Sequence, residues 1–172
     1  MKKRLLTILL AATVACTVFA GCGSKDSDTK KEATTTTKEA SDDTDDEDVA
    51  EDGMTSDGKF VSVEAYLNNP TVKSQLDQTI ESCSGQGMEL SIEATEDELI
   101  YIYKYDEQMV DDTFTLEQAA AALETSMQSQ ESTMQSAANS IGACIDLDSI
   151  TVKCQYYDAD GTLIKEFEFI SE

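Results

Sequence analysis

Several residue types that commonly carry enzyme chemistry are missing from this sequence. It has no histidine and no tryptophan, its only arginine is Arg4 and its only proline is Pro70. Without histidine, a Ser-His or Cys-His nucleophile, imidazole acid–base catalysis and most zinc or copper sites are excluded. We therefore expect no cofactor, no metal and no enzyme, with a carboxylate-based hydrolase as the alternative.

Positive charge is also scarce. The 172 residues carry 35 acidic and 12 basic side chains, a formal net charge of −23 at pH 7. If the three basic residues near the N-terminus are removed with a signal peptide, the charge becomes −26. Such a surface repels anionic lipid head groups and nucleic acid, which is bound through clustered lysine and arginine. The charge excludes a nucleic-acid partner and favours cations or basic partners.

The N-terminal segment has the pattern of a lipoprotein signal peptide. Three basic residues at positions 2–4 precede an apolar run, Leu5–Ala20, and small residues then lead directly to Cys22. We expect cleavage after residue 21 and a lipid on Cys22, which would place the protein at the extracytoplasmic face of the cell membrane. An ordinary cleaved signal or a single span is the alternative, but the run is shorter than the roughly 18 to 20 residues a span needs.

Residues 22–58 read as a disordered acidic tether. The segment consists mainly of Ser, Thr, Lys, Asp and Glu, with an acidic block from Asp42 to Asp52, and such composition cannot bury enough apolar surface to fold. The acidic block could also collect calcium or other cations, although unstructured carboxylates bind them loosely. The favoured interpretation is a spacer that holds a folded domain, residues 59–172, away from the membrane.

Apolar periodicity predicts two similar units in the folded domain. In the first, Asn69-Pro70 interrupts a helical pattern and restarts it towards Cys83, and period-two alternation then predicts strands at 88–95 and 99–105. In the second, Thr115 and Gln118 form a predicted capping box for one long helix ending near Gly142, and alternation predicts strands at 150–157 and 163–170.

These units predict an α+β, two-layer domain of the order helix-hairpin-helix-hairpin (αββαββ). Each helix has one apolar stripe and each hairpin one apolar face, so neither unit can bury its apolar surface alone. A four-stranded antiparallel sheet with both helices on one face buries all of it.

Three cysteines remain once Cys16 leaves with the signal and Cys22 carries lipid. Cys83 ends the first predicted helix and Cys144 follows the second, so a disulfide between them at one edge of the sheet is the first expectation, and three reduced thiols are the equal alternative. Cys154 shares parity with apolar strand residues and is expected in the core. A three-thiolate metal site lacks both Cys-x-x-Cys spacing and a histidine.

Two acidic clusters invite functional interpretations. Asp158-Ala-Asp-Gly161 has the start of a calcium-binding loop but not its remaining ligands or flanking helices, so we predict a hairpin turn. Asp106, Glu107, Asp111 and Asp112 precede the second helix. Paired carboxylates there could hydrolyse a glycan, but acids before a helix also suit its dipole.

The second predicted strand offers a candidate contact surface. Tyr101, Tyr103 and Tyr105 share one face, and Ile100 and Ile102 share the other. One set must face the helices and the other must point outwards, where an apolar patch on a charged monomer is typical of a contact site. Coverage of that patch by dimerisation or sheet bending is the equal alternative.

The chain resembles a family of bacterial, chiefly Gram-positive, lipoproteins defined by a C-terminal domain of unknown function. The resemblance covers about 59–170 and rests on Tyr66–Pro70 leading into the helix, the 88–105 hairpin and the Asp160-Gly161 turn. It implies a fold but no activity. The helix-hairpin order is also similar to β-lactamase-inhibitor-like envelope modules, which bind proteins, and this is an analogy of fold alone.

The sequence therefore favours a lipid-anchored protein, displayed outside the cell membrane, whose small domain binds an envelope protein or peptide. The alternatives are a carboxylate-based envelope enzyme and a passive acidic surface spacer.

Overall fold

The computed structural model describes residues 53–83 and 86–172. The expected signal peptide, Cys22 and most of the predicted tether lie outside these residues. Within the described part, no helix combines the length and the apolar character needed to cross a bilayer.

The described chain begins with two helices that meet at a sharp break. Helix α2 spans Val63–Asn68, and the Ser62 hydroxyl caps it by accepting from the Ala65 N–H at 3.0 Å. Helix α3 spans Pro70–Cys83. The Asn69 side chain accepts from the Thr71 N–H at 3.0 Å, and Pro70 stands at the first helical position, where its missing N–H costs nothing. The predicted break and restart are confirmed.

Four strands form one sheet in the order β1-β2-β3-β4. Strands β1 (Met88–Ala94) and β2 (Glu98–Tyr105) pair antiparallel, as do β3 (Thr151–Tyr157) and β4 (Leu163–Ile170). Strands β2 and β3, in the middle of the sheet, pair parallel, with Tyr103 opposite Tyr156. The α+β class and the four strands are confirmed, but the expectation of a purely antiparallel sheet is wrong.

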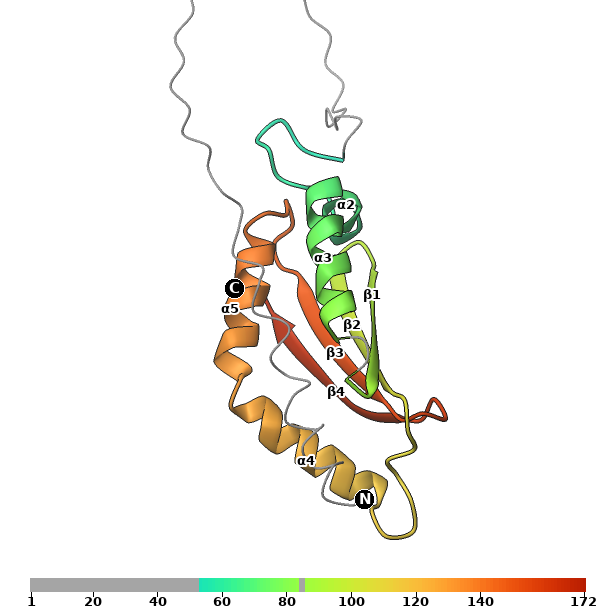
Figure 1. Ribbon diagram of the computed structural model, residues 1–172. Coiled ribbons are helices and arrows are strands. Elements are labelled where there is room, and N and C mark those ends of the chain that lie inside the picture. Colours follow the sequence, from blue (N-terminus) through green and yellow to red (C-terminus); the bar gives the residue numbers. More distant parts are fainter. Residues whose placement is uncertain (1–52, 84–85) are drawn as a thin grey trace, which may run out of the picture.

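The segment between β2 and β3 explains the parallel pair. It contains α4 (Leu116–Gln128) and α5 (Glu131–Gly142), which carry the chain back along the sheet, so that β3 starts at the end where β2 starts (Figure 1). Parallel neighbours require such a crossover, whereas antiparallel neighbours can be joined by a tight turn. The alternation of apolar and polar residues within a strand does not indicate whether the strand runs parallel or antiparallel to its neighbour.

The second helical region is two helices where one was expected. The capping box of Thr115 and Gln118 is confirmed at the start of α4. Near the break, the Gln130 N–H donates to the Met127 carbonyl at 2.8 Å, a three-residue spacing that tightens the last turn and ends the regular ladder. The break lets Met127 on α4 and Met134 on α5 both reach the core.

The core lies between the helices and one face of the sheet. On β2 and β3, alternate residues are buried, and their neighbours are partly buried or, at Lys104, exposed. Tyr103 and Tyr156 are each 1% exposed and stack with ring centroids 4.8 Å apart. The sheet thus has a helix-covered face and an open face, and any site on it belongs to the open face or to an edge.

Candidate functional site

The predicted contact surface divides between the two faces. The three tyrosines, Tyr101, Tyr103 and Tyr105, are 1–2% exposed on the helix-covered face. They therefore belong to the core, and their assignment to a contact surface is wrong. Ile100 and Ile102 lie on the open face and are partly exposed.

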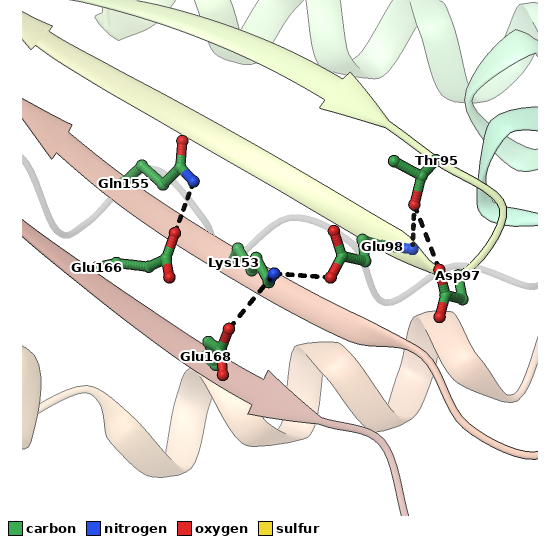
Figure 2. Close-up of polar contacts among 7 residues, drawn as sticks. All are labelled: Thr95, Asp97, Glu98, Lys153, Gln155, Glu166 and Glu168. Carbon is green, nitrogen blue, oxygen red and sulfur yellow. Dashed lines mark hydrogen bonds and ion pairs between the residues drawn. The ribbon is translucent and has the colours of Figure 1, made fainter. Parts of the chain in front are cut away.

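Charged side chains cross the open face beside these isoleucines. Lys153 on β3 lies between two acids, with its Nζ 2.6 Å from Glu98 Oε1 and 3.4 Å from Glu168 Oε1 (Figure 2). The hydrogen bond to Glu98 is the main reason that the pKa of Lys153 is raised. One row along, Gln155 Nε2 donates to Glu166 Oε2 at 2.6 Å. The open face is therefore a polar surface whose central charges bind one another.

A hollow of about 300 Å³ lies where the α4–α5 break faces strand β4. Its apolar lining is Met127 at the end of α4 together with Phe167 and Phe169 of β4. Because β4 is an edge strand, Phe167 on the helix-covered face and Glu168 on the open face both border the hollow. We call this hollow the β4 groove.

Carboxylates from three elements line the β4 groove: Glu124 from α4, Glu131 from α5 and Glu168 from β4. One ammonium group already lies at its margin. Lys165 Nζ is 3.8 Å from Glu124 Oε1 and 5.7 Å from the centre of the Phe167 ring. An ion pair combined with a cation–π contact is an arrangement that recognises amino and guanidinium groups. Within the described residues, Glu131 forms no ion pair.

A second hollow, of about 450 Å³, lies at the α2–α3 elbow. Its described lining consists mostly of small or amide side chains, including Ser62, Ala65 and Asn68, and among these described residues Glu64 is the only charged one. The described lining offers no aromatic surface and no convergent charges, so the β4 groove is the better candidate site.

Asp158 is the buried polar residue that sequence reasoning missed. The predicted hairpin turn is confirmed, with Gly161 at φ +88°, yet Asp158 itself is 0% exposed. Its carboxylate accepts from the N–H groups of Met109 and Val110 at 2.8 and 3.0 Å and from Gln108 Nε2 at 2.7 Å. The sequence does contain a signal for this burial, because Asp158 continues the two-residue alternation of the inward-facing residues of β3. Because its oxygens are occupied by the chain itself, Asp158 positions the loop before α4.

The buried hydroxyl of Tyr105 belongs to the same region. Burial, and secondarily the charge of Asp158, raises the pKa of Tyr105 to about 12. Among the described protein groups, this hydroxyl finds no hydrogen-bond partner.

The acidic cluster before α4 has a structural role at Asp111. Its Oδ1 accepts from the Thr113 N–H at 2.7 Å and from the Phe114 N–H at 2.8 Å, which shapes the turn into the helix. Asp106, Glu107 and Asp112 are exposed. Across residues 53–83 and 86–172, no three Cys, Asp or Glu side chains are placed together so that they could hold a metal ion.

The expected disulfide is not formed: Cys83, Cys144 and Cys154 are thiols in the described chain. Cys83 lies near Gly87, at the end of the sheet where β2 finishes and the Asp106 N–H donates to the Gly87 carbonyl. Cys144 lies at the opposite end, where its carbonyl accepts from Phe60, close to the β1–β2 turn.

The parallel crossover separates these two cysteines by the length of a strand, roughly 20 Å. A disulfide requires Cα atoms within about 7 Å. The predicted pairing assumed that both helices run in the same direction relative to the sheet, and they do not. Cys154 is buried in the core as predicted.

Comparison with known protein families adds one assignment. A family described as a domain of unknown function (DUF4854) matches residues 63–169. The chain belongs to this family. The expectation of a domain of unknown function is thus confirmed, and it assigns no activity. Searches of curated proteins and of solved structures gave no significant match.

Proposed function

We propose that this protein is a lipoprotein anchored through Cys22 at the extracytoplasmic face of the cell membrane, and that its domain binds an envelope protein or peptide. The basic start, the apolar run and the small residues before Cys22 support the anchor. The acidic composition of residues 22–58 supports a tether that gives the domain reach. The Gram-positive lipoprotein resemblance of the sequence agrees with both.

We place binding at the β4 groove. The observation that carries this proposal is the contact of Lys165 with Glu124 and Phe167, because it shows an ammonium group held by an acid and an aromatic ring of the groove. A hollow lined by apolar side chains and a few convergent polar groups is typical of binding sites. Ile100 and Ile102, on the open face, remain the second candidate surface, although ion pairs surround them.

A carboxylate-based enzyme is the weaker alternative. Catalysis by a carboxyl pair requires at least one acid kept in an unusual environment and open to substrate. Asp158 is the buried carboxylate among the described residues, and main-chain and amide donors occupy it. A passive spacer is the other alternative, and it predicts that the folded domain contacts nothing in particular.

Site-specific photo-crosslinking on intact cells tests the binding site. A photoreactive residue is placed at one of three exposed positions: Gln128 in the β4 groove, Ser91 on the open face or Ser74 on α3. We expect a discrete crosslinked product from position 128, which mass spectrometry can identify, and only background from position 74.

Other crosslinking results would point to a different binding surface or to none. A product from position 91 but not from 128 would move the site to the open face around Ile102. Equal, diffuse background at all three positions would favour a passive spacer. Release of the protein from the membrane fraction by Cys22→Ser tests the anchor separately, and unchanged membrane association would contradict it.

A further inference from the structure

We infer that the free edge of β4 and the adjoining groove bind an extended basic segment of a partner polypeptide, which pairs with β4 as a fifth strand and inserts a lysine or arginine side chain into the groove. This inference rests on the proposed function, because it names the chemistry of the partner at the same site.

The main-chain groups of β4 point alternately towards β3 and towards the free edge of the sheet. Beyond the strand end, the Ser171 N–H donates to the Ile150 carbonyl at 2.9 Å, so Ser171 faces β3. In an antiparallel pair the groups alternate, and the main-chain groups of Ile170, Glu168 and Glu166 therefore point away from β3. Gln135 Nε2 donates to the Ile170 carbonyl at 2.5 Å, which agrees with this direction.

This edge is covered at one end and bordered by the β4 groove further along. The side chain of Gln135 on α5 satisfies the Ile170 carbonyl, so the edge is closed at that point. Around Glu168 the β4 groove separates the strand from the helices. An exposed edge with unpaired N–H and C=O groups is a template for strand addition, and nearby pockets then select side chains.

The β4 groove combines apolar side chains with carboxylates. In an added strand, a residue opposite Phe167 directs its side chain to the helix-covered side, between Met127 and the acids Glu124 and Glu131. A lysine or arginine places its aliphatic stem against the apolar lining and its charge beside the carboxylates. Lys165 already makes this type of contact from within the chain, with Glu124 and the Phe167 ring.

Charge complementarity favours a basic partner over a second copy of this chain. The neighbouring side chains of β4 that project to the open face are Glu166 and Glu168, so an added strand meets acids on both faces. A second copy of this chain, at a formal net charge of −23, is repelled. A basic segment is attracted, and the attraction weakens with added salt.

Binding of synthetic peptides to the full chain in detergent micelles tests the inference. The probe is a fluorescent, end-blocked hexapeptide of alternating valine and lysine, and the matched control has glutamate in place of lysine. A third peptide has N-methyl groups on all its residues, which removes the main-chain donors of both edges and keeps the charge. We expect binding of the lysine peptide, measured by fluorescence anisotropy, and at least a tenfold loss for both other peptides.

Two pairs of charge-matched variants locate the site. Glu131→Gln removes an acid of the groove, and Glu117→Gln removes an exposed acid of α4 outside it. We expect the affinity for the lysine peptide to fall about five- to tenfold in Glu131→Gln and less than about twofold in Glu117→Gln. Lys165→Met removes the internal competitor, whereas Lys73→Met removes an equal charge from α3. Both variants change the net charge equally, so Lys165→Met should raise the affinity for the lysine peptide more than Lys73→Met does.

Several peptide-binding results would contradict the inference. Equal effects within each variant pair would show non-specific attraction to an acidic surface. Undiminished binding of the N-methylated peptide, or equal affinity for spermidine, would exclude strand addition. If a partner crosslinks at position 128 in cells but the lysine peptide does not bind, the proposed function stands and the partner class is wrong. Far-UV circular dichroism of each variant confirms folding, and the Glu131 pair decides the question if Lys165→Met does not fold.

Discussion

Asp158 Oδ1 accepts a hydrogen bond from the Met109 main-chain N–H at 2.8 Å, and the two residues lie 49 positions apart in the chain. The bond joins the turn between β3 and β4 to the loop that leads into α4. Asp158 is fully buried, so the loop and the turn are expected to hold their positions together.

Asp158→Asn should therefore destabilise the fold. The amide keeps one acceptor oxygen but leaves at least one buried donor without a partner, which costs about 1–3 kcal/mol. Urea denaturation followed by circular dichroism measures the loss in unfolding free energy. Asp160→Asn is the matched control in the same turn, because Asp160 is exposed and accepts chiefly from Thr162, with a lesser contact from the Gln108 side chain. An equal loss in both variants would contradict the role assigned to Asp158.

The buried hydroxyl of Tyr105 should make the stability of the fold decrease at alkaline pH. Its pKa is raised from 10 to about 12 in the folded state, so the folded state holds the phenolic proton more tightly than the unfolded state. This contribution to stability is full below about pH 10 and is lost as the pH rises towards 12, a loss of roughly 2–3 kcal/mol.

Tyr105→Phe should remove that alkaline loss with little cost at pH 7, since the hydroxyl has no partner among the described protein groups. Tyr157→Phe, whose hydroxyl donates to Gln155 Oε1 at 3.1 Å, is the control and should leave the alkaline transition in place. Unfolding free energies at pH 7, 9.5 and 11.5 measure both. An unchanged alkaline transition in Tyr105→Phe would show that another group causes it.

The two faces of β2 predict unequal costs of truncation. Tyr103 is buried and stacked on Tyr156, so Tyr103→Ala should cost about 3–5 kcal/mol through lost burial and a cavity. Ile102 is next in the chain but partly exposed on the open face, and Ile102→Ala should cost roughly 1–2 kcal/mol. Chemical denaturation of the two variants checks the assignment, and the reverse order would mean that the faces are exchanged.

The separation of Cys83 from Cys144 predicts the thiol content. Thiol titration of the denatured, unreduced protein should find Cys83, Cys144 and Cys154 all reactive. A disulfide between the first two would leave Cys154 as the single reactive thiol of the three. Cys144→Ser is the control, because it should lower the count by one thiol and leave stability nearly unchanged.

The local elements of this protein were predictable because local physics produces them. The Asn69-Pro70 restart, the Thr115 and Gln118 capping box and the Gly161 turn each depend on side chains within a few residues of their partners. Inward-facing strand residues such as Val152 and Cys154 were predictable from alternation alone. The break between α4 and α5 was not, since the apolar stripe continues across it and only packing against β4 shows where the helix must change direction.

The candidate site was hidden from the sequence for the same reason. Glu124, Glu131 and Glu168 are separated along the chain, and nothing in their spacing indicates that they surround one groove with Phe167. Asp158 was assigned to a turn, correctly, but its burial depends on a loop nearly fifty residues away.

By itself, the sequence determined the class of the fold, the four strands, the turns, the acidic surface and the absence of histidine chemistry, because each follows from composition or from contacts between near neighbours. The tertiary structure alone decided the parallel pairing of β2 with β3, the separation of the two cysteines and which face of β2 is buried. It also formed the groove at β4. These features depend on the direction in which the crossover helices return the chain, and alternation has the same period whether a strand runs parallel or antiparallel to its neighbour.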